Sequence, residues 1–249
     1  MTTATPQTEH RAATGTDPLA LIDVDHVRFY VGNAKQSAFF YASAFGFQVE
    51  QIRDLTTGSR ESAQYLLTQG NIRFILETPL SKNHPASAEL AKFGDGIKDI
   101  AFNVFDAEAA WKAAVKNGGE SAYEPVTASD AHGTVTTAGI KTYGRTVHTF
   151  VSRTGEYALP KIKQGALFMP GFRAIGPFAL NEYNKQHPCG LKFVDHAVGN
   201  VEEGKMNSWV DWYEHVLGFQ MFKHFDDNDI STEFSALMSK VMASGNQLI

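Results

Sequence analysis

The sequence predicts an α+β fold in which β-α-β-β-β units pair and form open, barrel-like sheets. Two observations support this prediction. The first is an internal repeat of three motifs: VDH followed by VGN, then GFQ, then GN. They occur at 24–33, 46–48 and 70–71, and they recur in the same order at 194–200, 218–220 and 245–246. The second is a recurring alternation of one strand, one helix and several strands. Motifs that recur in order indicate duplicated structural units.

The first unit begins with a predicted strand over residues 24–31, which are rich in β-branched and aromatic side chains. Asn33 is the expected N-cap of the next helix, and Gly46 is expected to end that helix. Its apolar residues fall on one helical face, namely Ala38, Tyr41, Ala42 and Phe45. A strand is predicted to open at Phe47, and two more are predicted over 61–68 and 72–78 with a turn at 69–71.

The second unit has the same order of elements. A strand is predicted over 97–105, Asp106 is the expected N-cap, and the helix over 107–116 ends at Asn-Gly-Gly. Three further strands are predicted over 121–126, 134–140 and 146–153. Residues 1–20 are small, polar and without periodicity, so we expect a disordered arm. Residues 21–154 are then the expected N-terminal domain, made of two paired units.

Residues 155–191 have a different composition, because prolines are spread among glycines (Pro160, Pro170, Pro177 and Pro188). This pattern predicts an irregular linker. A third unit is expected over 192–249, with a strand from Phe193, a helix around Trp209 and Tyr213, and strands over 219–225 and 232–240. This unit has no partner unit in the sequence to cover its apolar face. We therefore expect a truncated chain; the alternative is a natural short chain that dimerises through the third unit.

Composition narrows the class of protein. The net charge of -5 argues against a nucleic-acid partner, which requires a basic face. The single cysteine, Cys189, rules out an intramolecular disulfide and fits a reducing compartment, so we expect a cytoplasmic protein. No apolar run is long enough to cross a membrane, and the N-terminus lacks the pattern of a secretory signal.

Four long stretches carry a family resemblance. They read VGNAKQSAFFYASAFGF, TYGRTVHTFVSRTG, VDHAVGNVEEGKMNSWVDWYEHVLGF and DDNDISTEFSALMSKV (31–47, 142–155, 194–219 and 226–241). They resemble the vicinal oxygen chelate (glyoxalase-like) superfamily and, within it, the 4-hydroxyphenylpyruvate dioxygenase family. The resemblance runs from about residue 20 to residue 249. It implies a complete N-terminal domain followed by the start of a catalytic domain, over 192–249.

The resemblance also implies a reaction. The family converts 4-hydroxyphenylpyruvate and dioxygen into homogentisate and carbon dioxide, in the breakdown of tyrosine and phenylalanine. It uses non-haem Fe(II), held by two histidines and one carboxylate, and leaves positions open for an α-keto acid and dioxygen. Its members commonly form dimers or tetramers, so the resemblance implies a homo-oligomer at full length.

The motif match places three site residues on this chain. His196, in the VDH motif, corresponds to the first iron ligand, whereas the second histidine and the glutamate fall outside the sequence. Ser239 corresponds to a substrate-facing serine and Val198 to a residue of the pocket wall. Without the motif, a lone histidine on a buried strand is more often a core residue than a ligand. Ser239 could equally be an ordinary strand serine bonded to backbone.

His26 occupies the position of His196 in the first copy of the repeat. The family's other ligand positions would fall near Asp99 and Thr149, and threonine is a poor iron ligand. We therefore interpret His26 as structural. Two other functions remain open for the chain: a hydroxymandelate synthase, which uses the same iron and substrate, and a non-catalytic module that binds a small molecule.

Overall fold

The computed structural model describes residues 17–225, 239–247 and 249. The first unit contains β1, α1, β2, β3 and β4 (Leu21–Tyr30, Ala34–Phe45, Gln48–Arg53, Ser62–Gln69 and Ile72–Pro79). A helix, α2 (Pro85–Phe93), leads to the second unit. That unit contains β5, α3, β6, β7 and β8 (Gly96–Val104, Ala107–Lys116, Ser121–Asp130, Gly133–Lys141 and Val147–Arg153).

Shorter elements follow the two units. The connecting segment carries α4, β9 and α5 (Leu159–Ile162, Arg173–Ala174 and Asn181–Gln186). The third unit contains α6, β10 and β11 (Met206–Leu217, Gln220–Phe225 and Ser239–Ala243). The rest of the strand predicted over 232–240, and most of the motif over 226–241, lie outside the described residues. No helix of the described part is long and apolar enough to span a bilayer.

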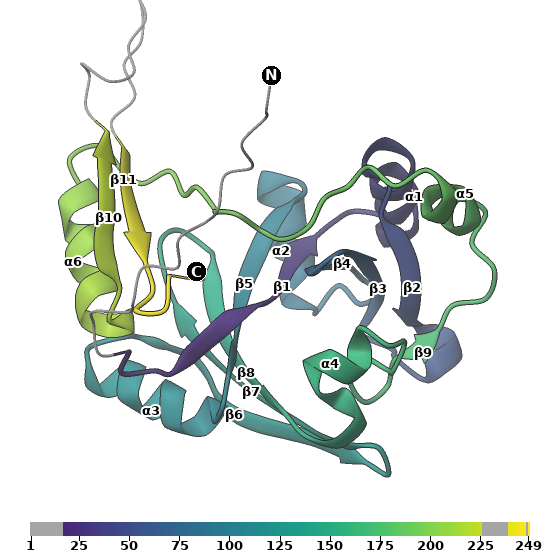
Figure 1. Ribbon diagram of the computed structural model, residues 1–249, viewed down its shortest axis with the longest axis horizontal. Coiled ribbons are helices and arrows are strands. Elements are labelled where there is room, and N and C mark those ends of the chain that lie inside the picture. Colours follow the sequence, from purple (N-terminus) through teal and green to yellow (C-terminus); the bar gives the residue numbers. More distant parts are fainter. Residues whose placement is uncertain (1–16, 226–238, 248) are drawn as a thin grey trace, which may run out of the picture.

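The first two units share one curved sheet of nine strands, in the order β6-β7-β8-β5-β1-β4-β3-β2-β9 (Figure 1). Within each unit the first and last strands are parallel neighbours: β1 pairs with β4, and β5 pairs with β8. Antiparallel pairing of β1 with β5 joins the units. The predicted α+β fold of paired β-α-β-β-β units in a half-barrel is therefore confirmed.

Local signals fix the helix ends. The Asn33 side chain accepts a hydrogen bond from the Gln36 amide, and Asp106 does the same for the Ala109 amide, so both predicted N-caps are confirmed. Gly46 ends α1 with a φ of 74°, in the left-handed region that favours glycine. The predicted helix over 107–116 has the bounds of α3.

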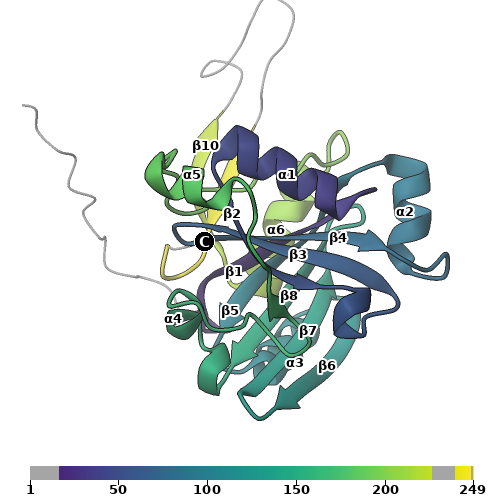
Figure 2. The ribbon, with the colours of Figure 1, turned by 90° about the vertical axis from the view of Figure 1, so that its right-hand side faces the viewer.

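The convex face of the sheet packs against helices. Buried alanines let α1 pack closely against the strands of the first unit (Ala34, Ala38 and Ala42). Buried alanines of α3 do the same against the strands of the second unit (Ala107, Ala110 and Ala114). Figure 2 shows α1 across the strands of the first unit, with α4 on the opposite side. Phe45, on the apolar face predicted for this helix, is 44% exposed, whereas Ala38 and Ala42 on the same face are buried. Apolar strand residues fill the space beneath both helices, so this face is the main core.

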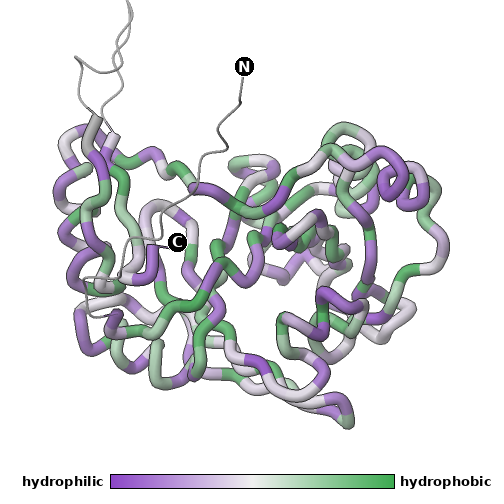
Figure 3. Tube along the Cα trace, in the orientation of Figure 1, coloured by the Kyte–Doolittle hydropathy of each residue, from purple (hydrophilic) through white to green (hydrophobic). Residues whose placement is uncertain are grey.

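The concave face is covered by the connecting segment. Four apolar side chains of this segment are buried against Leu66 and Ile75 of the sheet (Leu159, Ile162, Phe168 and Phe172). The backbone of the segment is largely irregular, as predicted, yet it packs into the fold. Figure 3 shows the more hydrophobic stretches along the central strands and the more hydrophilic ones along the outer helices and loops. The segment thus fills the inside of the half-barrel.

Order begins before the predicted boundary at Leu21. The Asp17 carboxylate accepts hydrogen bonds from the amides of Leu19 and Leu21, and Leu19 is buried in the core beside α3. The last four residues of the predicted arm are therefore part of the fold. Residues 1–16 lie outside the described residues.

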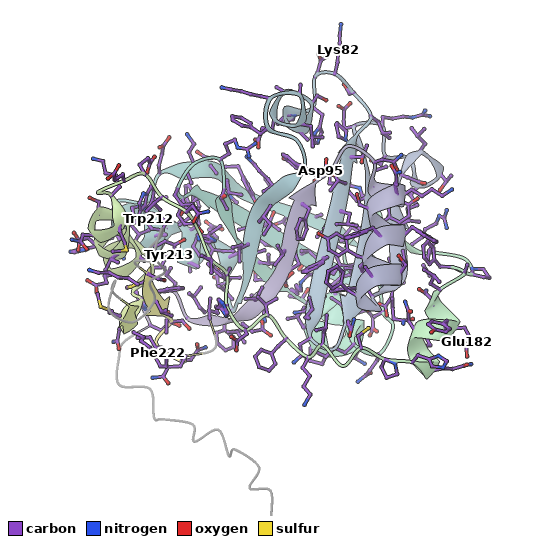
Figure 4. The ribbon with its side chains drawn as sticks, turned by 90° about the horizontal axis from the view of Figure 1, so that it is seen from above. Lys82, Asp95, Glu182, Trp212, Tyr213 and Phe222 are labelled. Atoms are coloured by element: carbon purple, nitrogen blue, oxygen red, sulfur yellow. The ribbon has the colours of Figure 1, made fainter. Side chains whose placement is uncertain are left out.

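The third unit packs against the second one. Val216, Leu217 and Phe219 are buried in the same core cluster as α3. Trp212 and Tyr213 lie on α6, beside the main sheet (Figure 4), and also pack against this cluster. We expected the apolar face of the third unit to lack a partner within the chain. The structure corrects this expectation, because the outer face of the second unit covers part of it.

A hydrogen bond between His148 and Tyr213 joins the second unit to the third. The Nδ1 of His148 lies 3.0 Å from the Ile100 carbonyl oxygen, and its Nε2 lies 2.8 Å from the Tyr213 hydroxyl. Burial lowers the pKa of His148, so the imidazole is neutral. Because a carbonyl can only accept, Nδ1 donates to Ile100 and Nε2 accepts from Tyr213.

Replacing Tyr213 with phenylalanine is expected to destabilise the protein by about 1–2 kcal/mol, because His148 Nε2 is then left buried without a donor. Chemical denaturation measures this change in the free energy of unfolding. Tyr183→Phe is the control, since Tyr183 is exposed on α5 and its substitution should change stability by less than about 0.5 kcal/mol. Equal stabilities of the two variants would contradict the role assigned to the hydrogen bond.

Candidate metal-binding histidine

His196 lies in the coil between α5 and α6, which runs over the outer edge of the half-barrel (Figure 1). The coil is held in place by backbone contacts: the Asn71 amide donates to the Lys192 carbonyl oxygen at 2.6 Å, and the Leu191 amide donates to the Gln69 side chain at 2.9 Å. Gly199 lies against the Tyr143 ring, so closely that a Cβ at this position would collide with the ring. These contacts on both sides of His196 in the sequence fix the position of the coil that carries it.

The expected strand from Phe193 is absent: the structure describes residues 193–200 as coil. The equivalent strand of the first unit, β1, lies between β4 and β5 and is hydrogen-bonded to both. Among the described residues, no strand pairs with 193–200. Because a strand is stabilised by its neighbours in a sheet, a strand-like sequence without such neighbours need not form a strand. The expectation that His196 lies on a rigid strand is thus not met in this structure.

The side chain of His196 is 68% exposed, and its Nδ1 lies 2.8 Å from Oδ2 of Asp195. A carboxylate oxygen accepts hydrogen bonds, so in this contact the ring donates through Nδ1. The lone pair of Nε2 is then left free toward solvent. This is the arrangement in which an imidazole serves as a metal ligand.

Val198 and Ser239 are on different segments. Val198 is 77% exposed, two residues beyond His196 in the coil. Ser239 is half-buried at the start of β11, where it lies opposite Phe225 in the hairpin. Within the described part of the chain, no hydrogen bond links either residue to His196, and no group of three His, Cys, Asp or Glu side chains is placed to hold a metal ion. The structure therefore offers one potential metal ligand.

The first copy of the repeat shows the same pair of residues in a buried setting. His26 Nδ1 lies 2.7 Å from Oδ1 of Asp25, and both side chains are almost fully buried. Asp25 also accepts two hydrogen bonds from Arg153, from Nε at 2.8 Å and from Nη2 at 2.9 Å. Arg73 donates from Nε to the Asp25 carbonyl oxygen at 2.5 Å. Asp25 is thus the centre of a buried polar cluster.

Charge pairing keeps this aspartate ionised. Burial by itself would raise the pKa of Asp25, but the charge and hydrogen bonds of Arg153, with a further hydrogen bond from His26, hold it well below its usual range. Burial lowers the pKa of His26 and outweighs the opposing effect of Asp25. The pair is therefore a neutral imidazole beside an ionised carboxylate.

Phe168 of the connecting segment covers His26. The two rings meet edge to face, with centroids 5.4 Å apart, and the Arg153 guanidinium lies 4.3 Å from the Phe168 centroid. Among the described residues, none forms a hydrogen bond with Nε2 of His26. Asp99, one of the other positions considered for a metal, accepts from the Thr149 amide at 3.1 Å and from its hydroxyl at 2.7 Å. His26 therefore packs against an aromatic side chain inside the fold.

A family model described as the Glyoxalase/Bleomycin resistance protein/Dioxygenase superfamily matches residues 23–142. Residues 23–142 therefore belong to this superfamily. The match covers β1 to β7, which is most of the nine-stranded sheet of this superfamily domain. His196 lies beyond the matched range.

Curated relatives extend the similarity along the chain. The 4-hydroxyphenylpyruvate dioxygenase of Coccidioides posadasii is 41% identical over 239 residues, which are 90% of this chain and 57% of that protein. Those of Yarrowia lipolytica and Danio rerio are 42% and 38% identical, over 90% and 92% of this chain and 56% of each relative. The chain spans a little more than half the length of these relatives. All three relatives are named 4-hydroxyphenylpyruvate dioxygenase.

A solved structure agrees with the fold of the superfamily domain and of the third unit. A triple mutant of 4-hydroxymandelate synthase from Streptomyces coelicolor superposes with a TM-score of 0.73 at 18% identity. The superposition covers 92% of this chain and 61% of that one. At this identity the likeness concerns the fold alone.

Sequence reasoning did not single out Asp195, nor the cluster of Asp25, Arg153 and Phe168. Asp195 had a visible signal, because aspartate precedes histidine in both copies of the VDH motif. The cluster had none, since Arg153 is 128 residues from Asp25 and only the sheet brings them together.

Proposed function

We propose that this chain is part of a 4-hydroxyphenylpyruvate dioxygenase. The enzyme would convert 4-hydroxyphenylpyruvate and dioxygen into homogentisate and carbon dioxide, in tyrosine and phenylalanine catabolism. The observation that supports this proposal most strongly is the identity of about 40% with curated relatives of that name, over 90% of the chain. The half-barrel of paired units agrees with it.

Fe(II) is the proposed cofactor, and His196 is its proposed first ligand. The free Nε2 of His196 and the carboxylate bound to Nδ1 suit a metal ligand. When bound, iron would supply the site at which the α-keto acid and dioxygen react, and the remaining ligands would come from residues outside this sequence. Val198 and Ser239 are proposed to line the substrate pocket. Each has a solvent-accessible side chain.

His196→Ala is expected to lower Fe(II)-dependent oxygen uptake with 4-hydroxyphenylpyruvate by at least about 100-fold, because even partners behind a metal ligand affect affinity 10–100-fold. The assay uses the full-length protein as it is produced in its native cell. Chromatography of the product separates homogentisate from 4-hydroxymandelate, and so tests the synthase alternative. A product other than homogentisate would overturn the proposed reaction.

His187→Ala is the matched control, because His187 is an exposed histidine at the end of α5 that contacts Tyr183. Its activity should equal that of the wild type. Full activity of His196→Ala would remove His196 from the metal site. We expect no turnover from residues 1–249 alone, and measurable turnover would contradict the proposal that further ligands lie outside them. A dimer or tetramer, and a cytoplasmic location, stay predictions.

A further inference from the structure

The repeat preserves an interaction as well as a motif. In both copies the aspartate of VDH contacts Nδ1 of the next histidine, at 2.7 Å for Asp25–His26 and at 2.8 Å for Asp195–His196. The two settings differ in every other respect. The first pair is buried on a strand, whereas the second is exposed in a coil that pairs with no strand in the described part of the chain. A contact that survives this difference is a property of the motif itself.

The contact also requires a departure from regular strand geometry. Successive side chains of a regular strand point to opposite faces, so neighbours in sequence do not meet. The pairing of β1 with β5 shifts register between Val24 and His26. A bulge of this kind turns adjacent side chains toward each other. In the first copy, the backbone of β1 therefore brings Asp25 and His26 together.

We propose that Asp195 is a positioning residue for His196. Its carboxylate accepts a hydrogen bond from Nδ1–H. This bond favours the tautomer of the neutral imidazole in which the Nε2 lone pair is free for a divalent metal ion. The inference deepens the proposed function and rests on it for the metal. In this role Asp195 acts through Oδ2, which accepts the hydrogen bond from Nδ1. Its role is to fix which nitrogen of His196 binds.

The tautomer of His196 can be measured without metal. Nitrogen shifts of the imidazole ring, from long-range ¹⁵N–¹H NMR spectra at pH 8.5, distinguish the protonated nitrogen from the bare one, and imidazole is generally neutral at this pH. We expect the Nδ1–H form to dominate at His196. Asp195→Ala should lower the ratio of Nδ1–H to Nε2–H by about five-fold or more, because an exposed charge-assisted hydrogen bond is lost.

Two histidines serve as references in the same spectra. His215 Nδ1 lies 2.8 Å from the backbone carbonyl of Asp211, so Asp211→Ala keeps the acceptor and should leave the His215 tautomer unchanged. His148 should show the Nδ1–H form in every variant, because Ile100 and Tyr213 hold both of its nitrogens. Asp211→Ala is thus the matched control for removal of an exposed aspartate near a histidine.

The outcomes separate this inference from the proposed function. A dominant Nε2–H form in the wild type, or a His196 ratio that Asp195→Ala does not change, would overturn the inference. A response of His196 to Asp195→Ala but not to Asp211→Ala supports it. The His196→Ala variant could retain turnover while the tautomer of His196 in the wild-type protein depends on Asp195. In that case the proposed metal-binding role of His196 is wrong, and the inferred Asp195–His196 interaction is correct.

Discussion

Replacing Asp25 with alanine is expected to destabilise the protein by about 3–5 kcal/mol, because the change leaves a buried cation without its partner. The Arg153 side chain is 2% exposed, and its Nε and Nη2 donate hydrogen bonds to the Asp25 carboxylate at 2.8 and 2.9 Å. Arg153 also donates to the Phe168 carbonyl oxygen, a bond that cannot compensate a full charge. The free energy of unfolding in urea, with an unchanged m-value, measures the loss.

Asp195→Ala is the matched control, since it removes the aspartate of the same motif beside the same type of partner. Asp195 is 79% exposed, so its removal should cost less than about 1 kcal/mol. Asp25→Asn removes the charge but keeps an acceptor, and it is expected to fall between the two. An Asp25→Ala variant as stable as Asp195→Ala would show that the buried pair contributes nothing.

The buried pair also sets a pH dependence. Because the folded protein holds the pKa of Asp25 well below its usual range, the unfolded chain binds the proton more readily. The stabilisation is fully present above the unfolded pKa of about 3.9 and is lost as pH falls toward the folded value. Asp25→Ala should therefore lose less stability between pH 5 and pH 3 than the wild type does, in paired unfolding curves.

Replacing Phe168 with alanine is expected to cost about 3–5 kcal/mol as well, through lost burial and the cavity that remains. Phe168 is 0% exposed and packs against His26, Arg153 and Phe172. Of these neighbours, His26 and Arg153 belong to two strands of the main sheet, β1 and β8, which cannot move together to fill the space. Urea unfolding at pH 7 measures the change.

Phe105→Ala controls for the loss of a phenyl ring. Phe105 is 80% exposed just after β5, and its substitution should change stability by less than about 0.5 kcal/mol. Small effects for both variants would show that the connecting segment is not part of the cooperative fold. A large effect for Phe168→Ala alone supports its place inside the half-barrel.

Short-range signals were sufficient for most elements. Asn33, Asp106 and Gly46 mark helix ends through contacts within four residues of themselves, so no tertiary information is needed to interpret them. Strand positions followed from runs of β-branched and aromatic residues. The apolar face predicted for α1 does not by itself give burial, because Ala38 and Ala42 are buried while Phe45 is 44% exposed.

The candidate site was predicted in part. The VDH motif pointed to His196, and the structure adds that Asp195 contacts it and that the ring is accessible. The expected strand around His196 depends on neighbours that the described residues do not include. Pairing is a long-range interaction, so a β-like sequence by itself does not make a strand.

By itself, the sequence determined the repeat, the order of elements and the resemblance to a dioxygenase family, because these depend on residue types and their spacing. Only the tertiary structure decided which distant groups meet inside the half-barrel. Asp25 acquires Arg153 from β8, and His26 acquires Phe168 from the connecting segment, each across more than a hundred residues. The physical reason is that curvature of the sheet and burial select these partners, and neither is encoded in any single stretch of the chain.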